Sequence, residues 1–146
     1  VYKRQDILVV PGGWGVRREL SNPVMREWLR RRAAEAETLT SVCTGAMLLG
    51  SAGLLDGLHA TTHWRSLEWM RASFPTVSVE SDKQVVADGR VFTSAGISAG
   101  IDMALQVVAR RVCHLGGKGD IKRGSGQGDK AQPQILCLYH VVTSGC

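Results

Sequence analysis

The feature that most constrains this chain is a unit made of a buried strand, a tight turn and a helix. Asp6 to Val10 is a short aliphatic run, typical of a strand buried on both faces, and Pro11-Gly12-Gly13 ends it with a tight turn. Asn22-Pro23 then supplies an N-cap and a first-turn proline, which predict a helix running to about Glu35.

The same unit occurs a second time. Thr38 to Val42 predicts another strand, Cys43 stands at its end, and Thr44 to Ala52 predicts a short helix closed by Gly53. Strands and helices that alternate in this way form a mostly parallel sheet with helices on its faces. The predicted fold class is therefore α/β.

The following part of the chain adds a hairpin and a last helix. Gln84 to Ala87 and Arg90 to Ser94 predict two strands, and Asp88-Gly89 between them is a signal for a type I′ turn. A helix is predicted from about Ser98. The apolar residues on one side of it are Ile101, Leu105 and Val108.

The distribution of charge argues against a nucleic-acid-binding surface in this patterned region. The 146-residue chain has a formal net charge of +5, yet residues 6–112 hold 12 Lys and Arg against 11 Asp and Glu. The basic excess lies at the two ends. The 44% hydrophobic content is enough for one core, and no apolar run approaches the roughly 18 residues of a membrane span.

The four cysteines give no disulfide or zinc pattern. They stand at Cys43, Cys113, Cys137 and Cys146, with no C-x-x-C pair and no partnered histidine spacing. We therefore expect no metal and a reducing compartment. Because nothing resembles a signal peptide, the expected location is the cytoplasm.

Cys43 stands where a strand passes into a helix. A thiol at such a corner lies beside the unpaired N–H groups of the helix's first turn, which favour the thiolate. The position therefore predicts a nucleophile, whereas an isolated cysteine would more often be an inert buried residue.

Four ordered blocks carry a family resemblance. They read "VVPGGWG" at 9–15, "SVCTGAMLLGSAGLLDG" at 41–57, "ATTHW" at 60–64 and "TSAGISAGIDMAL" at 93–105. Over residues 6–112 the chain resembles the ThiJ/PfpI superfamily (class I glutamine amidotransferase-like), nearest to isocyanide hydratases. The resemblance implies a flavodoxin-like three-layer sandwich with a mostly parallel sheet, and a cysteine on a nucleophile elbow.

The resemblance assigns roles to individual residues. Cys43 matches the nucleophile, and His63 matches a histidine near it that tunes the thiolate or orients a bound group. A lone histidine beside tryptophan is otherwise more often structural. Thr44 is expected to donate its hydroxyl to a reacting atom, to cap the helix that begins there, or both.

A substrate pocket is expected beside Cys43. The backbone N–H groups of Gly13 and Thr44 are candidates for an oxyanion-type site, with Gly12 allowing close approach. The alternative is that the Gly-Gly pair only serves a turn with positive φ. Trp14 and Trp64 are expected to wall the pocket.

Both ends of the chain depart from the family pattern. Residues 1–5 resemble a translated sequencing adapter, in the place where the family has a segment with an acidic residue. We therefore expect residues 6–112 to be a partial domain that lacks its N-terminal β-α-β portion. The glycine-rich composition after Val112 predicts that residues 113–146 are a non-native or disordered tail.

The function that the resemblance implies is that of a cysteine-dependent lyase. Such an enzyme converts R–N≡C and water into an N-substituted formamide without a cofactor, and its small-molecule site belongs to a homodimer in the parent protein. One alternative is the ligand-sensing domain of an AraC-type transcription regulator, which would bind nucleic acid only through a module that follows. Another is a redox-responsive or glyoxalase/deglycase-like relative, in which Cys43 is oxidised or processes carbonyl adducts.

Overall fold

The computed structural model describes residues 6–116 and 135–137. Its centre is a five-stranded sheet in the order β5-β6-β2-β1-β7. The strands are β1 (Ile7–Val10), β2 (Thr38–Val42), β5 (Val85–Asp88), β6 (Val91–Ser94) and β7 (Ile135–Cys137). All neighbours pair in parallel except β5 and β6, so the mostly parallel sheet expected from the sequence is confirmed.

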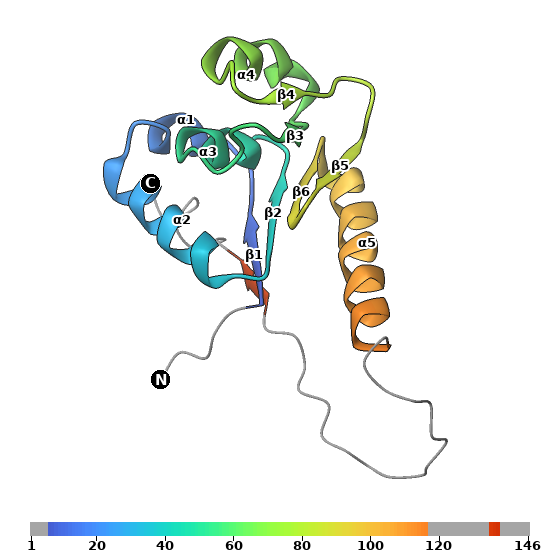
Figure 1. Ribbon diagram of the computed structural model, residues 1–146. Coiled ribbons are helices and arrows are strands. Elements are labelled where there is room, and N and C mark those ends of the chain that lie inside the picture. The colour runs from blue at the N-terminus through green and yellow to red at the C-terminus, as the bar shows by residue number, and fades with distance from the viewer. Residues whose placement is uncertain (1–5, 117–134, 138–146) are drawn as a thin grey trace, which may run out of the picture.

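Helices cover both faces of this sheet (Figure 1). On one face lie α1 (Val16–Glu19), α2 (Pro23–Glu35) and α3 (Gly45–Ser51), and on the other lies α5 (Ile97–Gly116). This three-layer arrangement is the flavodoxin-like sandwich. A smaller unit beside it consists of β3 (His59–Ala60), the 3₁₀ turn η1 (Trp64–Ser66), α4 (Leu67–Ser73) and β4 (Ser78–Val79).

The strand register places three carboxyl ends side by side. Val10 of β1 lies opposite Ser41 of β2, and Val42 of β2 lies opposite Ser94 of β6. The loops that leave these strands therefore meet at one edge of the sheet. In open α/β sheets this edge is where ligands bind.

Local signals set the ends of α2 and α3. The Asn22 Oδ1 accepts hydrogen bonds from the N–H groups of Val24 and Met25, so the predicted N-cap is confirmed. At the end of α3, Gly53 has a φ of 73°, and its N–H donates to the carbonyl of Gly50. This is the glycine-terminated helix end that the sequence predicted.

The larger core lies between the sheet and the α1–α3 layer. In α3 every residue from Gly45 to Gly50 is buried. The main apolar residues of this core are Leu8, Val10, Leu29, Leu39 and Leu55, together with Met47 and Leu49 of α3 itself. A helix that is apolar all round is stable only when covered on every side, which is the position of α3.

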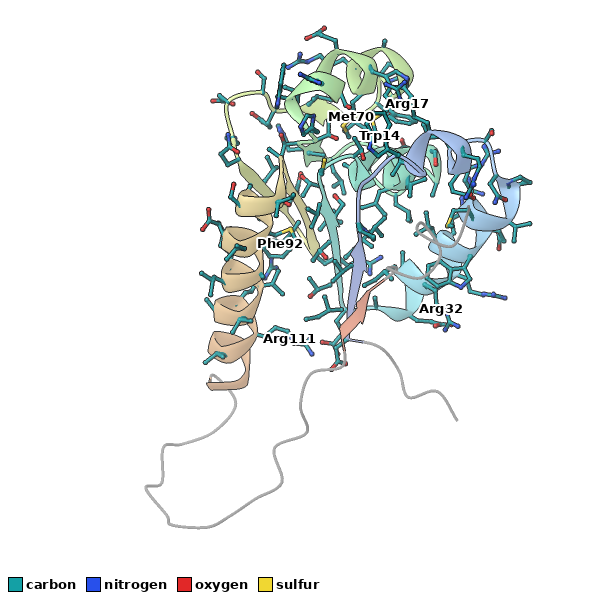
Figure 2. The ribbon with its side chains drawn as sticks, turned by 180° about the vertical axis from the view of Figure 1, so that it is seen from behind. Trp14, Arg17, Arg32, Met70, Phe92 and Arg111 are labelled. Atoms are coloured by element: carbon teal, nitrogen blue, oxygen red, sulfur yellow. The ribbon has the colours of Figure 1, made fainter. Side chains whose placement is uncertain are left out.

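The core on the α5 side is smaller. It consists of Ile7, Phe92, Met103 and Val107, and Figure 2 shows Phe92 between α5 and the sheet. Ile101, Leu105 and Val108 do share one side of α5, but that side is exposed by 56–64%. In residues 6–116 no helix is both long enough and apolar enough to cross a bilayer.

The hairpin between β5 and β6 differs from the predicted one. Asp88 pairs with Val91, so the two loop residues are Gly89 and Arg90 rather than Asp88 and Gly89. Gly89 has a φ of 58°, while the φ of Arg90 is not positive. Type I′ requires positive φ at both central residues, so the predicted type is wrong, and a glycine first in the loop fits type II′.

The expectations for the chain ends fall largely on residues that are not described. Residues 1–5, 117–134 and 138–146 lie outside the structure's described ranges. Among the residues that the structure describes, α5 continues past Val112 to Gly116, and β7 pairs with β1 through Ile7 and Ile135.

Candidate active site

Cys43 is a half-buried free thiol at the corner between β2 and α3. Its φ of 56° is the one positive value at a non-glycine position among the residues that the structure describes. Such a conformation costs about 1–3 kcal/mol and persists only when its surroundings hold it. A strained strand-to-helix turn that carries the reactive side chain is the geometry of a nucleophile elbow.

Two hydrogen bonds hold this backbone conformation. The Cys43 N–H donates to the Ser94 carbonyl at 2.9 Å, and the Thr62 Oγ1 donates to the Cys43 carbonyl at 2.9 Å. Thr62 and Ser94 are both buried. Because the amide and the carbonyl of one residue are both bonded, rotation of either peptide plane would break a contact in the interior.

Thr44 occupies the N-cap position of α3, but its side chain does not cap the helix. Instead its Oγ1 accepts a hydrogen bond from the Gly13 N–H at 3.0 Å. The hydroxyl hydrogen has no acceptor among residues 6–112, so it can be donated to a bound molecule.

The two glycines of the "PGG" turn are required for different physical reasons. A Cβ on Gly12 would lie 2.7 Å from the Thr44 nitrogen and 2.9 Å from the Val42 carbonyl oxygen, so glycine permits this loop to touch the elbow. Gly13 has a φ of 137°, a value that side chains rarely allow. Its N–H is bonded to Thr44, so a role as an oxyanion donor would require sharing that bond.

His63 is half-buried and caps η1. Its Nδ1 accepts from the Arg65 N–H at 3.3 Å, so in the neutral ring the hydrogen is on Nε2. The ring lies 5.6 Å from that of Trp64, centroid to centroid. Within residues 6–112 no hydrogen bond joins it to Cys43, and its role there stays a prediction.

The two tryptophans assigned to the pocket are exposed. Trp14 is 94% exposed and Trp64 is 66% exposed, and the Arg65 guanidinium lies 4.8 Å from the Trp64 ring centroid. Figure 2 shows Trp14 at the same end of the molecule as Met70 and Arg17. As pocket walls they remain a prediction.

One buried carboxyl group is found in residues 6–112, that of Glu19 on α1. Hydrogen bonds from Asn22 and then Arg18 lower its pKa, so it is held as a carboxylate rather than as an acid that could donate a proton. The same residues contain no group of three His, Cys, Asp or Glu side chains placed to hold a metal ion.

Comparison with known proteins identifies the relatives of this site. The model of the DJ-1/PfpI family matches residues 2–110. The chain belongs to the DJ-1/PfpI family. The fold class and the ThiJ/PfpI resemblance predicted from the sequence are thereby confirmed.

Individual family members include an enzyme and a regulator. The chain is 43% identical over 108 residues to isonitrile hydratase of Pseudomonas putida. This match covers 73% of the chain and 46% of that protein. It is 37% identical over 108 residues to the HTH-type transcriptional regulator CdhR of Pseudomonas aeruginosa, covering 74% of the chain and 32% of the regulator. The chain thus spans less than half the length of either relative.

A solved structure has the same fold. The ThiJ/PfpI family protein from Pseudomonas syringae superposes with a TM-score of 0.65 at 32% identity, covering 85% of this chain and 55% of that one.

Sequence reasoning missed Thr62 and Ser94. Thr62 stands within the "ATTHW" block, directly before His63, and Ser94 is the last residue of β6, the strand that pairs with β2. The local sequence does not predict that the Thr62 hydroxyl donates to the carbonyl of Cys43, 19 residues away.

Proposed function

We propose that Cys43 is the nucleophile of an isonitrile hydratase-like reaction in the protein from which this chain comes. The observation that carries the proposal is the left-handed backbone of Cys43 at a strand-to-helix corner. Strain of this kind is retained where it serves a reactive group. The 43% identity to a protein named isonitrile hydratase supports the choice of substrate class.

The reaction has two covalent stages. The Cys43 thiolate adds to the terminal carbon of R–N≡C, forming a C–S bond, and that carbon takes up one proton to give a thioimidate. Water then adds to the same carbon, and one of its protons goes to the nitrogen. The C–S bond breaks as the new hydroxyl group loses the second proton, and the thiolate leaves. The product is the N-substituted formamide, so one isonitrile and one water are consumed and no oxidant or reductant is needed.

The neighbours of Cys43 fit these steps. The Thr44 hydroxyl has its hydrogen available and its oxygen fixed by Gly13, so it is our candidate for orienting the attacked group or the water. The exposed rings of Trp14 and Trp64 offer apolar contact for the R group of a small substrate. We also expect the parent protein to work as a homodimer.

The test uses an alkyl isonitrile and mass spectrometry. The full-length parent protein is incubated with the isonitrile, and both the formamide and an adduct on Cys43 are measured, with Cys43→Ala and Cys43→Ser as variants. We expect both signals to disappear in Cys43→Ala, and Cys43→Ser to lose at least about 100-fold in rate. Formamide produced at an unchanged rate by Cys43→Ala would refute the proposal.

A second candidate is a ligand-sensing domain of a transcription regulator. The identity to CdhR covers nearly the same share of the chain as that to the hydratase, 74% against 73%. A sensor binds its ligand without consuming it. Saturable binding of a small molecule that is recovered unchanged, with Cys43→Ala binding equally well, would favour this candidate over the enzyme.

A further inference from the structure

We propose that Thr62 is a positioning residue for the reactive end of Cys43, acting through the peptide group between Cys43 and Thr44. The inference rests on the proposed role of Cys43 as nucleophile. Thr62 is 1% exposed, and its Oγ1 donates to the Cys43 carbonyl at 2.9 Å. It therefore contacts the backbone of the nucleophile and not the substrate.

The hydrogen bond from Thr62 to the Cys43 carbonyl also fixes the direction of the Thr44 N–H. The peptide groups of the described residues are all trans, so the Cys43 C=O and the Thr44 N–H point in opposite directions from one rigid plane. When Thr62 holds the oxygen on the interior side, the Thr44 N–H is directed to the other side. That N–H is the group expected to stabilise negative charge beside the thiol.

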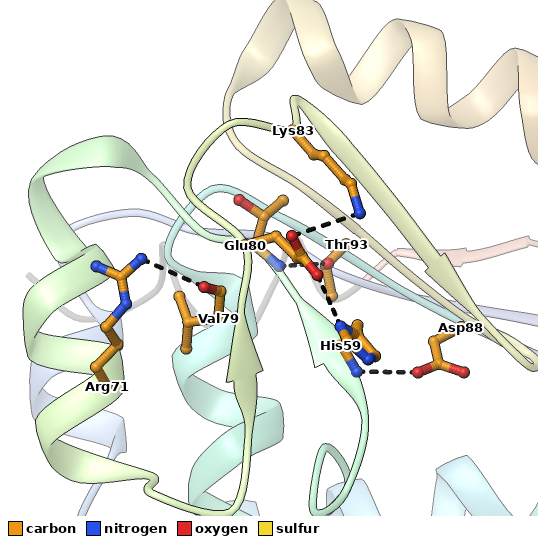
Figure 3. Close-up of polar contacts among 8 residues, drawn as sticks. His59, Arg71, Val79, Glu80, Lys83, Asp88 and Thr93 are labelled. Carbon is orange, nitrogen blue, oxygen red and sulfur yellow. Dashed lines mark hydrogen bonds and ion pairs between the residues drawn. The ribbon is translucent and has the colours of Figure 1, made fainter.

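The segment that carries Thr62 is itself anchored, as Figure 3 shows for the residues before it. The Thr61 N–H donates to the Thr93 Oγ1 at 2.8 Å in the interior. Two residues earlier, the His59 N–H donates to the Asp88 carboxylate at 2.9 Å, and the His59 ring pairs with Glu80 at 2.7 Å. The hydroxyl of Thr62 therefore belongs to a segment that is hydrogen-bonded to β5 and β6.

Thr40 provides a matched control, because its buried hydroxyl has a structural role only. Thr40 of β2 is 2% exposed, and its Oγ1 donates to the Leu8 carbonyl at 3.1 Å. It makes the same kind of buried bond, three residues before Cys43, to a peptide that does not belong to the elbow. Loss of either hydroxyl leaves a buried carbonyl without that partner and lowers stability similarly.

The experiment measures alkylation of Cys43 by iodoacetamide in the folded chain, from pH 5 to pH 10, with mass spectrometry to assign the labelled cysteine. Urea unfolding is measured on the same variants. We expect Thr62→Val to slow alkylation of Cys43 about tenfold near neutral pH and to move the pH–rate midpoint upward. Thr62→Ser should restore the rate, and Thr40→Val should lose stability with the rate unchanged.

The outcomes separate this inference from the proposed function. If Cys43 of the unchanged chain reacts no faster than in the urea-unfolded chain, the nucleophile assignment fails and the role of Thr62 fails with it. If Cys43 is fast and Thr62→Val leaves both rate and midpoint unchanged, only the role of Thr62 is overturned. Should Thr62→Val not fold, Thr62→Ala is compared with Thr62→Ser by the same rates and the same criteria.

Discussion

The two helical layers of this molecule bury their apolar residues to very different degrees. In the α1–α3 layer, α3 has no polar side chain from Gly45 to Gly50, and every one of these residues is buried. In the α5 layer the buried side consists of Ala99, Met103 and Val107. The exposed side of that helix carries the apolar residues Ile97, Ile101, Leu105, Val108 and Val112.

The denser packing of the α1–α3 layer accounts for the rigidity of the candidate site. Cys43 lies directly before the fully packed helix α3, and the glycines around it allow backbone to touch backbone. The strain at Cys43 therefore belongs to the tightly packed layer, where small shifts meet resistance. On the exposed side of α5 a similar change would meet solvent.

The largest expected effect comes from adding a methyl group beside the elbow. A Cβ on Gly45 would lie 2.2 Å from the Val10 carbonyl oxygen, and backbone atoms cannot move aside as a flexible side chain can. We expect Gly45→Ala to cost about 4 kcal/mol in the free energy of unfolding, measured by urea denaturation.

The matched control for that variant lies at the start of the other layer. A Cβ on Gly96 would meet nothing within 4 Å, and this residue precedes α5. Gly96→Ala should change the free energy of unfolding by less than about 1 kcal/mol. Equal losses at Gly45 and Gly96 would contradict the difference in packing.

A leucine pair sharpens the comparison at the next level of effect. Leu49 of α3 is fully buried, and Leu105 of α5 is 64% exposed. Because both changes place alanine in a helix, their difference reports packing. We expect Leu49→Ala to cost about 3 kcal/mol and Leu105→Ala to stay within about 0.5 kcal/mol. A cost above about 2 kcal/mol at Leu105 would mean that the exposed side of α5 is covered in solution.

The smallest effect concerns pH and the carboxylate of Glu19. Hydrogen bonds from Asn22 and Arg18 lower its pKa in the folded chain, so its contribution is present above the unfolded-state pKa and is lost as pH falls through the folded-state value. Glu19→Gln should cost about 1 kcal/mol at pH 7 and have less effect at pH 3, measured by urea unfolding. A cost that is the same at both pH values would argue against the charged contacts.

Those parts of the fold that depend on neighbouring residues could be predicted from the sequence. The Asn22 cap and the Gly53 helix end rest on interactions within a few residues, and the strand at 38–42 is marked by its own run of β-prone residues. Each of the three is confirmed. The hairpin type was wrong because the register with Val91 keeps Asp88 in the strand. Which side of α5 packs depends on the sheet below it, and apolar spacing alone does not reveal that.

For the candidate site the division is similar. The sequence predicted Cys43 at a strand-to-helix corner, within the family-like block at 41–57. It did not indicate that the Thr44 hydroxyl would accept from Gly13, 31 residues away, or that Thr62 would bond to the Cys43 carbonyl. Partners at such separations are chosen by how loops meet at the sheet edge.

The alternation of strands and helices, the family, and the place of Cys43 at a strand-to-helix corner follow from the sequence alone. The left-handed conformation of Cys43 depends on tertiary contacts, because it is unfavourable for an isolated residue and is held here by the Ser94 carbonyl and the Thr62 hydroxyl. These two groups lie at Cys43 because β2 pairs with β6 and because the segment after β3 is bonded to β6 through Thr61 and Thr93.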